Sequence, residues 1–151
     1  MGLDMYLYKV QREQVGYWRK ANAIHAWFER KCGEGEPLDN CKEYYLNKED
    51  LIELRDLCKK VLDSCTLVEA DIQNGERLVG NIWMPIYEKG LKIKNPELAQ
   101  ELLPTQKGFL FGSLDYDEYY VEDLKQTIQQ IDKILETTDF TKEEICYFAW
   151  W

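Results

Sequence analysis

Residues 17–28 read YWRKANAIHAWF, and on a helix of 3.6 residues per turn they form two separate faces. One face carries apolar side chains with the spacing of a helix that packs on a core: Tyr17, Ala21, Ile24 and Phe28. The other face carries polar groups beside an aromatic ring: Trp18, Asn22 and His25, with Glu29 just beyond and Arg19 at the edge. The stretch predicts a helix, ending near residue 31, that presents more than a core stripe.

The second face has the chemistry of a nucleotide site. An indole can stack on a base, an amide and an imidazole can bond to the edge of the base, and a guanidinium can hold a phosphate. The alternative is structural: Trp18 and His25 can pack beneath a neighbouring strand, with the histidine bonded to a backbone carbonyl. Nothing in the sequence places a nucleophile such as Cys41 beside His25, so we expect binding rather than acid–base catalysis.

The whole chain is acidic, because its 151 residues carry a formal net charge of −9. No basic patch is visible in the sequence, so long duplex nucleic acid is not an expected ligand. An acidic surface can imitate DNA toward a basic protein, or it can simply keep a protein in solution. Aromatic residues make up 13% of the chain, which favours a recognition surface because Tyr and Trp provide large contact areas at low entropic cost.

The five cysteines form no Cys-x-x-Cys pair, and with a single histidine they give no zinc spacing. They are expected to be free thiols of a reducing compartment. The opening residues lack the pattern of a signal peptide, and no stretch is long and apolar enough to span a membrane. We therefore expect a cytoplasmic protein without membrane contact, metal or cofactor.

Alternation and capping signals predict most of the elements. Residues 3–10 and 144–151 alternate as half-buried strands do, and we expect these two strands to pair. Asn47 is placed to cap a helix that runs to about residue 65. Pro96 lies in the first turn of a short helix that ends near residue 103. The longest helix is expected to start at Ser113 or Asp115 and to end near residue 136.

The remaining segments are less regular. Residues 41–46 predict a short strand or extended segment, and residues 107–112 a buried strand or ordered loop. Within residues 66–95 we expect turns at Asn74–Gly75 and at Lys89–Gly90, and Pro85 should interrupt any regular element. The order of elements predicts a single α+β domain over residues 1–151, with a small, mainly antiparallel sheet and three to four helices.

Residues 103–113, LPTQKGFLFGS, are the second unusual stretch. Their two glycines allow a close approach of backbone to ligand, and Thr105, Gln106 and Lys107 offer polar groups and a positive charge. The stretch matches no nucleotide-binding fingerprint, so we expect it to line a pocket rather than to cradle a phosphate. Tyr44, Tyr116 and Tyr119 can reach a cleft, or they can serve packing alone. The carboxylates that follow, from Asp115 onward, suit a helix start better than a calcium loop.

Several of these segments together resemble a family of small proteins found in phages and bacterial genomes. The resemblance rests on the opening MGLDMYL, on YWRKANAIHAWF, on Asn40–Cys41 with Glu43–Tyr44, and on LPTQKGFLFGSLDYDEYY. It covers most of the chain except roughly residues 66–95. This combination of motifs is specific for the family, but it indicates little about the activity of its members.

Proteins of this kind include phage immune-evasion proteins, among them sponges that sequester cyclic oligonucleotide signals without cutting them. The resemblance therefore implies a non-enzymatic protein that holds a nucleotide-derived signal such as a cyclic dinucleotide and blocks host antiviral defence. The acidic balance departs from what an anionic ligand prefers, so Arg19, Lys20 and Lys107 would have to supply positive charge locally. The main alternative is an acidic inhibitor that binds a protein; a small phosphodiesterase is a weaker one. Exposed aromatic residues also favour a homo-oligomer.

Overall fold

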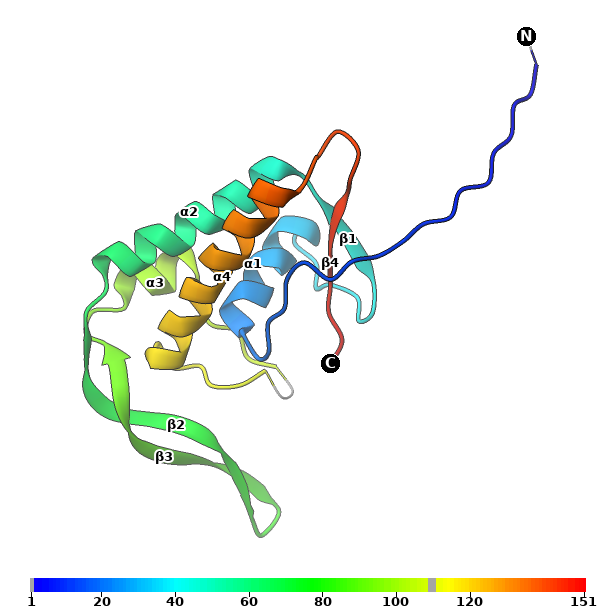
Figure 1. The fold of residues 1–151 in the computed structure, drawn as a ribbon. Coiled ribbons are helices and arrows are strands. Elements are labelled where there is room, and N and C mark those ends of the chain that lie inside the picture. The colour runs from blue at the N-terminus through cyan, green and yellow to red at the C-terminus, as the bar shows by residue number, and fades with distance from the viewer. Residues whose placement is uncertain (1, 109–110) are drawn as a thin grey trace.

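The computed structural model describes residues 2–108 and 111–151, and in them two helical layers support two separate antiparallel strand pairs (Figure 1). The elements follow one another as α1 (Asn22–Cys32), β1 (Glu43–Leu46), α2 (Lys48–Ser64), β2 (Leu67–Val79), β3 (Ile82–Ile93), α3 (Glu97–Leu102), α4 (Glu118–Thr137) and β4 (Ile145–Phe148). The fold is a single α+β domain, as expected. No helix in the described ranges is long and apolar enough to cross a membrane.

The core lies between α2, α4 and α1. Helix α2 begins where Asn47 and Asp50 form a reciprocal capping box, which satisfies two backbone amides at the helix start. Its apolar stripe and that of α4 meet, and Leu54, Leu124 and Ile131 have no measurable exposure. The two helices run side by side in opposite directions (Figure 1). The predicted helices from Asn47 and after Asn95 are confirmed.

Strands β1 and β4 form a small antiparallel sheet over α1. Tyr44 pairs with Tyr147 across this sheet, and the Tyr147 ring stacks on Phe28 of α1 at a centroid distance of 3.9 Å. The expected alternation in the closing strand is confirmed, since Ile145 and Tyr147 are half-buried while Cys146 and Phe148 are exposed. The expected partner was wrong. Strand β4 pairs with β1, and residues 2–15 form no strand in the structure.

Residues 2–15 instead form an exposed arm that leaves the body beside the β1–β4 sheet (Figure 1). Arg12 makes an ion pair with Glu43 at the base of the arm. The alternation that predicted a strand is present, but β4 pairs with β1 instead, and no described strand of the chain pairs with the arm. An alternation of apolar and polar residues indicates that a segment is suited to a half-buried strand. It does not indicate which strand, if any, the segment pairs with.

Helix α1 starts five residues later than the sequence suggested. Lys20 adopts a left-handed backbone conformation with φ of 57°, which breaks the helical path before Asn22. Ala21, Ile24 and Phe28 are buried as expected, but Tyr17 precedes the helix and is 62% exposed. Helix α4 also starts late, at Glu118, because Ser113 and Asp115 bond elsewhere and Asp117 is the N-cap.

Strands β2 and β3 form a long ribbon that projects from the body (Figure 1). The expected turns were wrong. Asn74–Gly75 lies at an irregularity where the register shifts between Gln73 and Glu76, and Lys89–Gly90 lies within β3. Gly90 is needed because a Cβ atom there would approach Ile72 Cδ1 to 2.4 Å. Pro85 also lies within β3, opposite Glu76 beside the irregularity, which is where a ribbon tolerates proline.

Candidate functional site

Asn22 is a buried polar hub that ties the loop between α3 and α4 to the start of α1. Its Nδ2 donates to Phe111 O at 3.1 Å and to Ser113 O at 2.8 Å, and its Oδ1 accepts from Gln106 N at 3.0 Å. Asn22 is only 6% exposed and is one of the few polar residues that are buried in the domain. Both ends of this loop therefore meet at one amide. The part of the expected segment 107–112 that the structure describes contains no strand, and residues 109–110 lie outside the described residues.

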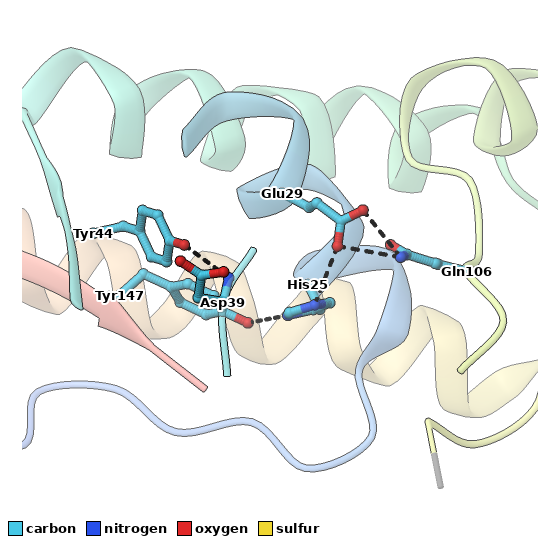
Figure 2. A network of polar contacts seen from close by, with 6 residues as sticks. All are labelled: His25, Glu29, Asp39, Tyr44, Gln106 and Tyr147. Carbon is cyan, nitrogen blue, oxygen red and sulfur yellow. Dashed lines mark hydrogen bonds and ion pairs between the residues drawn. The ribbon is translucent and has the colours of Figure 1, made fainter. Parts of the chain in front are cut away.

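His25 lies one turn further along α1, in a cluster of polar and aromatic groups (Figure 2). Its Nδ1 is 2.6 Å from Tyr147 Oη, and its Nε2 is 3.6 Å from Glu29 Oε2. Gln106 Nε2 donates to both oxygens of Glu29 at 3.3 Å. The sequence placed His25 and Glu29 on one face, and the structure confirms this and adds Gln106 and Tyr147.

The protonation state of His25 follows from its surroundings. Burial lowers the pKa of His25 below its ordinary value, and the negative charge of Glu29 opposes this shift only in part. The imidazole is therefore neutral at pH 7. The distance from Nε2 to Glu29 is too long for a hydrogen bond, and this buried nitrogen has no hydrogen-bond partner in the described part of the chain.

Two aromatic rings lie against His25 on the side of the loop. The Phe111 and Trp151 rings each contact the imidazole edge-to-face at centroid distances of 5.2 Å, and they lie 5.9 Å from each other. Trp151 is fixed through its backbone, because Asn40 accepts from Trp151 N and donates to Trp151 O. Its side chain remains 42% exposed. Together these rings form an apolar surface that reaches solvent.

Three basic residues border the same hub. Arg19 and Lys20 immediately precede α1, and Lys107 follows Gln106 in the loop that Asn22 holds. A Cβ atom added to Gly112 would lie 3.2 Å from Lys20 Cβ, so the loop and the residues before α1 are in contact. All three residues are exposed, and no ion pair involves them in the ranges that the structure covers. The first turn of α1 has no acidic residue, so its positive end is also uncompensated.

We call this surface the basic–aromatic rim and define it by five residues: Arg19, Lys20, Lys107, Phe111 and Trp151. It differs in sign from the chain as a whole, whose net charge is −9. Rings that reach solvent can stack on a base, and cations at a helix start can hold a phosphate.

The structure separates Trp18 from this rim. Its Nε1 donates to Thr127 Oγ1 of α4 at 2.8 Å, and its ring packs edge-to-face on Phe28 at 5.9 Å. Trp18 thus joins the segment before α1 to α4 and takes the structural role that the sequence left as an alternative. Asn22 is also engaged within the protein, because both N–H groups of its amide donate to backbone carbonyls and its oxygen accepts from Gln106 N.

The other residues predicted from the sequence either stabilise the loop, lie near His25 or lie away from the rim. Thr105 N donates to Tyr116 Oη at 3.1 Å, so this pair stabilises the loop that carries Gln106 and Lys107. Tyr44 Oη accepts from Asp39 N at 2.8 Å. Tyr44 pairs with Tyr147 in the sheet, and Tyr147 in turn contacts His25 (Figure 2). Tyr119 lies apart from the rest, in an open hollow of about 400 Å³ lined also by Leu67 and Leu91.

Sequence reasoning missed Phe111, Tyr147 and Trp151 as members of the cluster. The alternation of the closing strand put Tyr147 on the same side as Ile145, which was a usable signal for an inward ring. No local signal marked Trp151, because its position depends on Asn40, 111 residues away in the chain. Lys20 was noted only as a charge, whereas its left-handed backbone sets the start of α1.

Comparisons with known proteins identify no relative that could suggest a role for this site. A scan against protein-family models, a search of curated proteins and a search of solved structures each gave no match for this chain. The described residues also contain no group of three or more His, Cys, Asp or Glu side chains that could hold a metal ion.

Proposed function

We propose that this chain is a non-enzymatic binding protein that sequesters a small nucleotide-derived anion, of the cyclic dinucleotide class, at the basic–aromatic rim. The observation that carries the proposal is that the exposed Trp151 ring and the partly exposed Phe111 ring lie beside cations that make no ion pair with the described residues, in a chain that is acidic as a whole. In a phage protein, such sequestration would remove an antiviral signal of the host. The host cytoplasm is the compartment where this would act.

The rim supplies each kind of contact that such a ligand needs. Trp151 and Phe111 offer faces or edges for stacking, worth about 1–3 kcal/mol per base. Arg19, Lys20 and Lys107 offer charge to phosphate oxygens, and each charged hydrogen bond contributes about 1.5–3 kcal/mol. His25 lies beneath these rings and supports them, since its Nε2 is buried and does not reach the surface.

The side chains around the rim favour holding a ligand over transforming it. Tyr147 engages one nitrogen of His25, and the lowered pKa keeps the imidazole neutral at pH 7, which suits a hydrogen-bonding role. Asn22, Thr105, Tyr116 and Trp18 then position the loop and the start of α1 rather than contact the ligand.

Isothermal titration calorimetry against a panel of cyclic dinucleotides and longer cyclic oligonucleotides tests the proposal. We expect one or more members to bind, with affinity falling as salt rises because phosphate contacts are screened. Arg19→Ala and Lys107→Ala should each weaken binding roughly tenfold or more. Lys59→Ala, an exposed lysine on α2, removes the same charge elsewhere and should leave affinity unchanged.

Absence of binding to every panel member by the folded protein would overturn the proposal. Capture of a stoichiometric basic protein that salt releases would then favour the acidic-inhibitor alternative. Chromatography of the ligand after release from the protein tests the non-enzymatic part. The ligand should be recovered intact, and a cleaved product that accumulates with time would instead identify an enzyme.

A further inference from the structure

The outer part of the β2–β3 ribbon exposes apolar side chains on both of its faces. Leu78 pairs with Trp83, and Val79 pairs with Ile82, so neighbouring pairs point to opposite sides. Trp83 is 64% exposed and Ile82 is 69% exposed. An ordinary surface hairpin is apolar on one face only. This ribbon therefore has two faces to cover.

The base of the ribbon is anchored, and its outer part is not. Ile72 is fully buried, Gln73 N donates to Asp115, and Ile93 N donates to Tyr116 O. Beyond the irregularity at Gln73/Glu76, the residues of both strands are exposed. Two strands alone are marginally stable in water, and stability normally needs a third strand or a covering layer.

The chain also carries a segment suited to be that third strand. Residues 3–8 of the arm alternate in the manner of a strand, and Leu3, Met5 and Leu7 are 80–102% exposed on one side of it. Tyr6 and Tyr8 on the other side are 71% and 82% exposed. No backbone hydrogen bond involves residues 3–8 in the part of the molecule that is described. The arm thus exposes apolar or aromatic side chains on both faces, as the ribbon does, with Asp4 on the face of the two tyrosines.

Length and charge match between arm and ribbon. Residues 3–8 and the outer strand residues 82–87 are each six residues long, so they can pair over their whole length. Residues 2–15 carry two acidic and two basic side chains, Asp4 and Glu13 against Lys9 and Arg12. The ribbon between residues 76 and 87 carries Glu76 and Arg77. Both segments are neutral in a chain of net charge −9, so two copies can meet there without repulsion.

The two segments do not pair within one copy in the structure. The arm leaves beside the β1–β4 sheet and points away from the body, whereas the ribbon projects in a different direction from the end that carries α3 and the start of α4 (Figure 1). We propose that the arm of one copy adds as a third strand to the outer ribbon of a second copy, and that the second copy returns the same contact. Such a reciprocal exchange closes as a two-fold dimer, in which the backbone of each arm pairs with an open edge of the two-stranded ribbon and the apolar side chains of arm and ribbon lie side by side on both faces.

Light scattering after size-exclusion chromatography, over a broad dilution series, tests this inference. We expect the full chain to have twice the monomer mass of 18.0 kDa. Leu3→Ser with Leu7→Ser in the arm, or Trp83→Ser in the ribbon, should weaken self-association by roughly tenfold or more. Phe148→Ser, at a side chain of β4 that is 48% exposed, is the matched control and should leave the dimer intact.

A mixing experiment identifies the pairing itself. The arm variant keeps its ribbon and the ribbon variant keeps its arm, so a mixture of the two should recover a mixed dimer with one intact contact. A melting curve of the Trp83→Ser chain, compared with that of the native chain, checks separately that this variant is folded. A monomeric full chain, an arm variant that stays dimeric, or a mixture that fails to associate would overturn the proposal. Because the basic–aromatic rim is untouched by these variants, nucleotide binding is measured independently.

Discussion

Asn22 shows how one side chain can join segments that lie far apart in the sequence. Its amide satisfies two carbonyl groups and one N–H group of the loop between α3 and α4. Buried backbone groups that lose their partners each cost about 1–3 kcal/mol. The loop, and with it Gln106 and Lys107, therefore depends on this residue for its position.

We expect Asn22→Ala to lower the free energy of unfolding by about 2–4 kcal/mol, since three partly buried backbone groups would lose their partner. The melting temperature should fall by roughly 2–4 °C for each kcal/mol in a domain of this size. Arg19→Ala, three residues earlier and exposed, is the control and should melt like the native chain. Equal melting temperatures for Asn22→Ala and the native chain would contradict the structural role.

His25 gives the molecule a pH dependence whose sign is fixed by its surroundings. Its pKa in the folded state is lowered from the ordinary value of 6.5, so the unfolded chain binds a proton more readily. The contribution of His25 to stability is present above pH 6.5 and is lost as the pH falls through the unfolded and then the folded pKa. Asp123 acts in the opposite sense, because burial among like charges raises its pKa to about 7.

The effect of His25 is isolated by comparing the native chain with His25→Asn. In urea unfolding between about pH 7.5 and 5, the native chain should lose more stability on acidification than the variant does, because only the native chain has this proton to bind. Asp123 is common to both chains and cancels in the comparison. An identical pH dependence in the two chains would contradict a neutral, buried His25.

Among the elements, helix α2 begins at a capping motif that can be recognised in the local sequence. Asn47 Oδ1 accepts from Asp50 N at 2.8 Å, and Asp50 Oδ2 accepts from Asn47 N at 3.0 Å. We expect Asn47→Ala to cost about 1 kcal/mol in urea unfolding, and Asn47→Ser to restore most of that loss because serine is also a good N-cap. A loss of the same size in both variants would mean that the cap contributes through packing instead.

Local signals predicted those elements whose determinants are local. The Asn47 cap, Pro96 and the apolar stripe of α4 placed three helices, and the alternation of residues 144–151 placed β4. The partner of β4 and the start of α1 were missed. The first depends on which strands are close in space, and the second on the backbone conformation of Lys20. Neither has a signature in sequence spacing.

The ribbon illustrates a different failure of sequence reasoning. Gly75, Pro85 and Gly90 are all residues that usually interrupt a strand, and here all three lie within β2 or β3. Gly90 is present because Ile72 packs against it from the partner strand, and Gly75 takes a φ of 98° at the irregularity. Such residues mark close approach or bulges as often as turns, and a single sequence does not separate the two.

At the scale of the whole molecule, charge and apolar surface are divided among distinct regions. The cations of the basic–aromatic rim lie before α1 and in the loop between α3 and α4, whereas the arm and the outer ribbon have no net charge and expose apolar side chains. From the sequence, His25, Gln106 and Lys107 could be named as candidates for one site, because their segments are unusual in composition. Trp151 and Phe111 could not, since their positions arise from Asn40 and Asn22.

The most direct test of the account follows the indole N–H signals of the five tryptophans by ¹H–¹⁵N NMR during titration with the cyclic nucleotide that binds best in calorimetry. If the ligand binds at the basic–aromatic rim, we expect the Trp151 signal to shift as ligand is added, and the signal of Trp83 in the outer ribbon to stay unchanged. The indole of Trp18 should remain bonded to Thr127 throughout. Saturable binding with no shift of Trp151, or with Trp83 as the responding signal, would contradict the assignment of the site to the basic–aromatic rim.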